Sequence, residues 1–115
     1  MNDPRFVAPP PIQQLSAPAL KTMIDEGHHF ELVDVRTPYE QEIARIVGAR
    51  LLDQETHDYL LSLDRDTPIV FQCHHGIRSQ SAAEYFQREG FTNLYNLIGG
   101  IDAWSLHVDR HVPRY

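Results

Sequence analysis

Short apolar runs alternate along this chain with stretches in which apolar residues recur every three or four positions. A run with branched residues predicts a strand at 30–35, and other short runs predict strands at 49–52, 69–72 and 94–97, with a shorter edge strand at 12–15. The helical patterns run from Ser16 to Gly27, after Thr37, from Asp53 to about Leu61, from Gln80 to Glu89 and from Ile101 to Val108. Alternating strands and helices imply right-handed crossovers. The predicted fold is α/β, with a mostly parallel sheet of about five short strands and helices on both faces.

Polar residues stand where several of these helices begin. Ser16 and Asp53 are placed as N-caps, and Thr37-Pro38-Tyr39-Glu40 reads as a capping box with proline at the first helical position. Ser79 is expected to cap the helix that follows it, rather than to act as a nucleophile. These caps fix where the predicted elements start.

The length of 115 residues fits one domain with a single core. We expect residues 1–11, which end in Pro9-Pro10-Pro11, to form an extended tail. Residues 12–115 then make up the domain.

The candidate catalytic residues lie in the stretch 73–79, Cys-His-His-Gly-Ile-Arg-Ser, between a predicted buried strand and a helix. Ligands of open parallel sheets bind beyond the carboxyl ends of the strands. At a helix start, backbone N–H groups without partners and the helix dipole favour negative charge. A Cys73 thiolate would be stabilised there, and a lowered pKa makes a cysteine nucleophilic. Cys73 is therefore the candidate nucleophile, in preference to a small buried apolar residue.

Charge along the chain supports this interpretation. The formal charge is −6, yet residues 67–83 contain no Asp or Glu, so the cysteine lies in a neutral to positive stretch. The acidic balance and the single lysine argue against nucleic-acid binding. No apolar run reaches the length of a bilayer span, and no signal-like pattern begins the chain. One cysteine forms no intrachain disulfide, and a free thiol suits the cytoplasm.

Three segments together give the chain a family likeness. They are 32–36 (Leu-Val-Asp-Val-Arg) with Glu40 and Gly48-Ala49, the loop 73–79, and 96–104 (Asn-Leu-Ile-Gly-Gly-Ile-Asp-Ala-Trp). With these segments in this order, the chain resembles a single-domain rhodanese, a sulfurtransferase, from Leu15 to about Trp104. The resemblance implies the three-layer rhodanese-like fold. One departure is Ala44-Arg45-Ile46, where many members have Gly-His-Ile, and it affects only the expected local packing.

The resemblance also implies a reaction. A sulfane sulfur moves from a small anionic donor such as thiosulfate to Cys73, and then to cyanide, a thiol or a protein acceptor, without a cofactor. Residues 74–79 (His74, His75, Gly76, Ile77, Arg78 and Ser79) would bind the substrate, with backbone N–H groups forming an anion cradle and Arg78 adding a fork-shaped donor. Asp34 and Arg36 either support this loop or simply stabilise the fold.

Other functions remain as alternatives. Phosphatases and arsenate reductases of related folds have five residues between Cys and Arg, whereas four separate Cys73 from Arg78. A thiol sensor or other non-enzymatic interaction module is the second alternative, although a sensor lacks a resolving cysteine here. We expect no metal site, because His74 and His75 are adjacent and no CxxC or HExxH pattern accompanies them.

Overall fold

The computed structural model describes residues 8–115, and its centre is one five-stranded sheet in the order β1-β5-β4-β2-β3. All four neighbouring pairs are parallel. The strands are β1 (Gln13–Leu15), β2 (Glu31–Asp34), β3 (Arg50–Leu51), β4 (Ile69–Gln72) and β5 (Leu94–Leu97). The helices are α1 (Ala17–Asp25), α2 (Pro38–Ile43), α3 (Gln54–Leu61), α4 (Ile77–Arg88) and α5 (Gly100–His107). The predicted parallel α/β sheet is confirmed.

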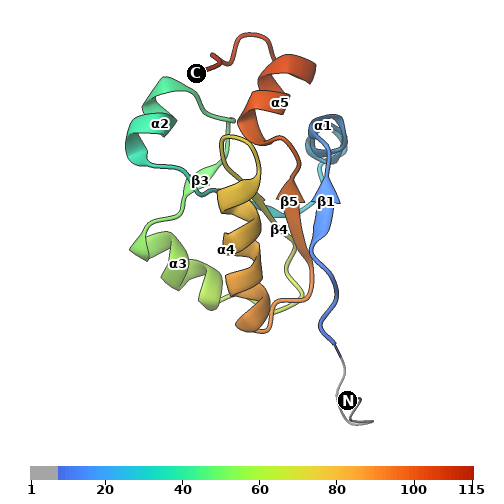
Figure 1. Ribbon diagram of the computed structural model, residues 1–115. Coiled ribbons are helices and arrows are strands. Elements are labelled where there is room, and N and C mark those ends of the chain that lie inside the picture. The colour runs from blue at the N-terminus through green and yellow to red at the C-terminus, as the bar shows by residue number, and fades with distance from the viewer. Residues whose placement is uncertain (1–7) are drawn as a thin grey trace.

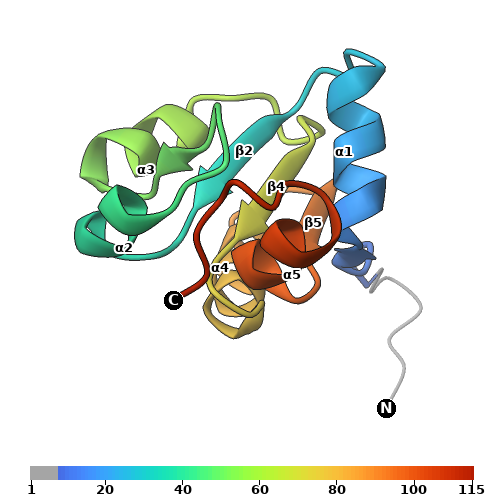
Figure 2. The same cartoon turned by 90° about the horizontal axis from the view of Figure 1, so that it is seen from above.

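Two apolar clusters cover opposite faces of the sheet, because successive side chains of a strand point to opposite sides. On one face, α1 and α5 pack over the sheet through residues that include Leu20, Leu32, Val70, Leu97, Ile101 and Trp104. On the other, α3 and α4 do so through Val33, Leu60, Ile69, Phe71, Ala83 and Phe86. The strands point toward the end of the molecule where α2, α5 and the last residues lie (Figures 1 and 2).

The predicted caps begin three of the helices. The Ser16 side chain accepts a hydrogen bond from the Ala19 N–H, and Asp53 accepts one from the Thr56 N–H. The Thr37 side chain accepts from the Glu40 N–H, and the Glu40 carboxylate accepts from the Thr37 N–H. These reciprocal bonds form the predicted capping box, which fixes where α2 starts after β2.

One predicted boundary was wrong. Helix α4 begins at Ile77, three residues before Gln80, and its N-cap is Gly76 rather than Ser79. Gly76 has φ of +102°, which only glycine adopts without strain, and a Cβ there would lie 3.2 Å from the Leu97 carbonyl oxygen. Because the chain turns at Gly76, Ser79 lies inside the first turn, where its side chain serves another purpose.

The predicted tail falls mostly outside the described residues, which begin at residue 8. Residues 8–11 belong to no helix or strand, and the Pro10 carbonyl accepts a hydrogen bond from the Gln87 side chain at 3.0 Å. Within residues 8–115, no helix is long and apolar enough to cross a membrane.

Candidate active site

Cys73 follows the last residue of β4 and is 1% exposed. Its Sγ accepts hydrogen bonds from the Gly76 N–H at 3.1 Å and the Ser79 N–H at 3.4 Å, and lies 3.2 Å from the Ser79 hydroxyl oxygen. Burial raises the pKa of the Cys73 thiol. For the thiolate, a hydrogen bond from the Ser79 hydroxyl, made when its hydrogen turns to the sulfur, and those from the N–H groups of Ser79, Gly76 and His75 outweigh burial and leave this pKa below its ordinary value.

The loop around the sulfur is held by hydrogen bonds on its outer side. The Ile101 and Asp102 N–H groups, in the first turn of α5, donate to the carbonyls of Cys73 (2.8 Å) and His74 (3.2 Å). In a planar trans peptide the N–H points opposite to the C=O. Two carbonyls bound on the outer side therefore turn the following N–H groups, those of His74 and His75, toward the inner side. Of the N–H groups expected to form the cradle, those of His75, Gly76 and Ser79 are hydrogen bonded to the Cys73 sulfur.

The turn between β5 and α5 packs directly on this loop. Gly100 has φ of +60°, and a Cβ at this position would run into the carbonyl oxygens of Cys73 and His74, far inside van der Waals contact. Only glycine lets the two backbones approach so closely. The turn that contains Gly100 thus approaches the cysteine loop closely.

Arg78 is paired with a carboxylate. Its two terminal nitrogens donate to the two carboxylate oxygens of Glu40 at 2.8 and 2.9 Å. The bond from Arg78 lowers the pKa of Glu40 far below its ordinary value, and Glu40 raises that of Arg78. Each terminal nitrogen keeps a second N–H, and the Nε–H is a further donor. Arg78 can therefore bind an anion while its charge is balanced by Glu40.

The Ser79 hydroxyl connects the cysteine to β5. Its hydrogen is donated to the Asn96 Oδ1 at 2.6 Å, while its oxygen faces the Cys73 sulfur. Ser79 is fully buried and Asn96 is 4% exposed. The expectation that Ser79 caps a helix was wrong, because this hydroxyl is used in a tertiary contact.

His74 and His75 lie at the mouth of the site. A cavity of about 280 Å³ is bordered by Cys73, His74, His75, Ile77 and Arg78. The His74 ring stacks on the His75 ring and on the Tyr115 ring, with centroids 3.9 Å apart in both pairs. Burial lowers the pKa of His74, and His75 adds to this effect. His74 is therefore held as a neutral, flat wall of the mouth.

Within residues 8–115, His74, His75 and Asp102 are the residues best placed to hold a metal ion, with ligand atoms within 4.8 Å of one another. Their geometry fits a metal poorly. The two imidazole planes are stacked at only 28°, so their in-plane lone pairs run side by side rather than converging. The Asp102 carboxylate also accepts hydrogen bonds from Arg114. In this arrangement the three residues are better explained by stacking and ion pairing.

Asp34 and Arg36 form a fully buried ion pair, with Arg36 N–H groups 2.9 and 2.8 Å from the two carboxylate oxygens. Arg36 also donates to the Ala44 carbonyl at 2.6 Å, which holds the end of α2. Within residues 8–115, neither side chain is hydrogen bonded to the loop 73–79. The link is indirect, because the Tyr115 hydroxyl accepts from Arg36 and donates to Glu40.

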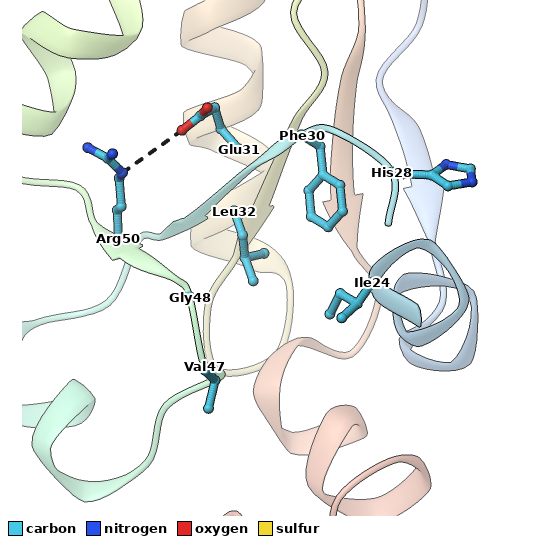
Figure 3. A pocket seen from close by; sticks show the side chains of 8 residues that line it. All are labelled: Ile24, His28, Phe30, Glu31, Leu32, Val47, Gly48 and Arg50. Atoms are coloured by element: carbon cyan, nitrogen blue, oxygen red, sulfur yellow. Dashed lines mark ion pairs between the residues drawn. The ribbon is translucent and has the colours of Figure 1, made fainter. Parts of the chain in front are cut away.

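A second cavity of about 280 Å³ lies near the amino-terminal end of β2 (Figure 3). Its walls are Ile24, His28, Phe30, Glu31, Leu32, Val47, Gly48 and Arg50. The Glu31 and Arg50 side chains face each other across part of it, with 3.9 Å between N and O. Cys73 follows the carboxyl end of the neighbouring parallel strand, so this cavity lies away from the cysteine.

Comparison with known proteins identifies the family. A family model described as Rhodanese-like domain matches residues 16–107, which is most of the chain. The chain belongs to the rhodanese-like family. A thiosulfate sulfurtransferase, GlpE, of Pseudomonas aeruginosa is 40% identical over 93 residues, which cover 80% of this chain and 83% of the relative. The enzyme of the same name from Ectopseudomonas mendocina is 40% identical over 74 residues, covering 64% of this chain and 68% of that protein.

Solved structures agree with the family fold. A rhodanese-like domain protein from Staphylococcus aureus has a TM-score of 0.72 and 28% identity, and the match covers 90% of this chain and 99% of that one. A protein from Rhodopseudomonas palustris described as a possible tyrosine phosphatase has a TM-score of 0.71 and 23% identity, covering 90% and 85%. At that identity the second likeness shows the fold alone.

The departure from the rhodanese-like pattern at 44–46 is accommodated by packing. Ala44 and Ile46 are buried in the cluster beneath α1 and α5, and Arg45 points to solvent. The Ala44 carbonyl accepts the Arg36 hydrogen bond described above.

Sequence reasoning missed Asn96, Tyr115 and the pairing role of Glu40. For Asn96 a signal was present, since asparagine is unfavourable in strands and this one interrupts an otherwise apolar run, 94–97. A buried polar residue requires partners, which would have marked it as part of a network. Tyr115 and Glu40 gave no such signal, because their partners are distant in the sequence.

Proposed function

We propose that this rhodanese-like protein is a thiosulfate sulfurtransferase that carries the transferred sulfur as a persulfide on Cys73. The observation that supports this most directly is the surround of the Cys73 sulfur, a half-ring of N–H donors beneath an open mouth. Relatives named thiosulfate sulfurtransferase at 40% identity support the same activity.

In the first step, the Cys73 thiolate attacks the outer sulfur of thiosulfate. A new S–S bond forms, the S–S bond of thiosulfate breaks, and sulfite leaves with the electron pair. The protein then holds a persulfide anion, Cys–S–S⁻. The cradle of N–H groups stabilises this negative charge, as backbone donors do in oxyanion holes. Arg78 offers its free N–H groups to the sulfonate oxygens of the donor.

In the second step, cyanide or a thiolate attacks the terminal sulfur of the persulfide. The terminal sulfur leaves as thiocyanate or as a new persulfide, and the Cys73 thiolate is restored. Neither step needs a proton. The exposed Ile77 and the neutral His74 border the path of the acceptor. A protein thiol is a further acceptor class, and a reducing compartment such as the cytoplasm would keep Cys73 free between turnovers.

An intact-mass measurement tests the proposal. The protein is treated with thiosulfate in the absence of reductant, and then with cyanide. We expect a mass gain of one sulfur, which cyanide removes and Cys73→Ser does not show. A Cys73→Ser protein that is folded and still turns over thiosulfate would refute the mechanism. If no sulfur is gained, a phosphate ester assayed in parallel tests the phosphatase alternative.

A further inference from the structure

A chain of side-chain hydrogen bonds lies behind Cys73, and its direction is fixed by groups that only accept. The Asn96 amide nitrogen donates to the Gly76 carbonyl at 3.1 Å and to the Gln14 Oε1 at 3.0 Å. Gln14 in turn donates to Gln80 at 2.8 Å. A carbonyl oxygen has no hydrogen to give, so the Gly76 contact settles which end of the Asn96 amide is nitrogen.

With the amide oriented in this way, the Asn96 Oδ1 accepts the Ser79 hydrogen at 2.6 Å. A serine hydroxyl carries a single hydrogen. While this hydrogen points to Asn96, only lone pairs of the Ser79 oxygen face the Cys73 sulfur, 3.2 Å away. The thiol S–H is then the donor in the Cys73–Ser79 contact. The protonated form of Cys73 fits the resting network.

When Cys73 is a thiolate, Ser79 must be the donor in the Cys73–Ser79 contact. A sulfur anion has no hydrogen to donate, and two oxygen lone pairs facing it are repulsive. Ser79 can turn its hydrogen to the thiolate, but the Asn96 Oδ1, which is buried, then loses its donor. An unpaired buried acceptor is costly. Asn96 and the thiolate therefore compete for one hydrogen.

We propose that Asn96 is a positioning residue that acts through Ser79. By holding the hydroxyl hydrogen, Asn96 limits how strongly Ser79 stabilises the Cys73 thiolate. It thereby sets the pH at which the thiol becomes nucleophilic. This inference rests on the proposed function only in that Cys73 is taken as the reactive thiol.

Other charged groups near the loop are unchanged by substitution of Asn96. They are Arg78 from α4, Glu40 from α2, Asp102 from α5, His74 and His75 from the loop itself, and Tyr115. Their contribution to the acidity of Cys73 is therefore common to all variants compared below. Any difference between variants reports the hydrogen-bond chain.

The test measures the rate of Cys73 alkylation by iodoacetamide against pH. Cys73 is the only cysteine in the sequence, so intact mass reports its reaction alone. Four proteins are compared: the parent, Asn96→Leu, Ser79→Ala and the double variant. The midpoint of each profile is used, because the plateau also depends on access to the sulfur. No sulfur donor is present, so the result is independent of whether the chain transfers sulfur.

Asn96→Leu keeps the approximate volume but removes the acceptor, which frees the Ser79 hydrogen for the thiolate. We expect its midpoint to move to lower pH, with alkylation about tenfold faster where the parent is mostly thiol, as a hydrogen bond to a charged group would give. In the Ser79→Ala background, Asn96→Leu should leave the midpoint unchanged. Asn96→Ala is the second variant if the leucine protein does not fold. Leu94→Val, on the same strand, controls for loss of stability alone.

Two results would overturn the inference. One is an Asn96→Leu midpoint that is unchanged or moved to higher pH in a folded protein. The other is a shift of equal size with and without the Ser79 hydroxyl, which would place the effect of Asn96 in its bond to the Gly76 carbonyl. Coupling between the two substitutions is the signature that a merely structural Asn96 would not produce.

Discussion

Glu40 balances the charge of Arg78, and Glu40→Gln removes this balance while almost keeping the shape. Glutamine also serves at this position of a capping box, so the contact with Thr37 is retained. The pKa of Glu40 is held far below its ordinary range, chiefly by Arg78, so the carboxylate is charged at any pH used for assay. The substitution therefore adds one net positive charge beside the mouth of the site at every such pH.

The size of the effect on thiosulfate binding follows from how exposed the Arg78–Glu40 pair is. The Arg78 side chain is 44% exposed and that of Glu40 is 15% exposed, so the charges interact partly through water. Pairs of this kind contribute about 0.2–1 kcal/mol, and a dianion feels the lost carboxylate twice. We expect the KM for thiosulfate to fall roughly fivefold, which corresponds to about 1 kcal/mol. The loss of folding stability should be no larger than this.

The assay is steady-state transfer from thiosulfate to cyanide at low salt and again at about 1 M salt, where the Debye length is only about 3 Å. The decrease in KM should appear at low salt and largely vanish at high salt. Glu42→Gln is the matched control, since Glu42 is an exposed residue of the same helix. A KM that is unchanged or higher in Glu40→Gln at low salt would refute the reasoning, because Arg78 would then not face the donor.

Three further predictions concern the loop itself. Arg78→Ala should raise the KM for thiosulfate about tenfold in steady-state kinetics but lower stability by less than about 1 kcal/mol in thermal melting. Kinetics equal to those of the parent would show that Arg78 does not contact the donor. Because the pKa of Cys73 is lowered, kcat/KM should rise with pH through a midpoint below that of an ordinary thiol, and a midpoint at the ordinary value would contradict this. Gly100→Ala should abolish transfer and destabilise the protein severely, whereas Gly27→Ala, also at positive φ but with nothing within 4 Å of its Cβ, should cost only about 1–2 kcal/mol in a denaturant titration and retain activity. Similar losses in both glycine variants would show that backbone strain, not the close approach at Gly100, is responsible.

The fold was predictable because its signals are local. The Thr37–Glu40 capping box lies within four residues, and Asp53 caps the helix that follows it directly. The apolar run 69–71 is buried at every position, as its continuous apolar character predicted, and Gln72, which ends the strand, is buried with it. A parallel sheet then follows from the order of the elements, since each crossover must pass through a helix.

The site was predictable only in part, because its key contacts join distant segments. Arg78 was expected to donate to the substrate, but its pairing with Glu40, 38 residues earlier in the chain, was not foreseen. Ser79 looked like a cap from its neighbours, but its hydroxyl meets Asn96, 17 residues later. Neither pairing leaves a pattern within one helix or strand. Such contacts follow from the register of the sheet, which brings Phe71 beside Asn96 and so places β5 behind the cysteine loop.

The charge in the proposed cycle explains why a fixed cradle is sufficient. The site carries one negative charge as the Cys73 thiolate, and one again as the persulfide anion after sulfite leaves. Because the thiolate and the persulfide carry the same single negative charge, the same N–H groups serve both states without moving. Two helices supply this rigidity: the first turn of α4 donates to the sulfur, and the first turn of α5 binds the outer carbonyls through Ile101 and Asp102. A reaction that protonated a leaving group would need a mobile acid here, whereas sulfur transfer needs only that the loop stay in place.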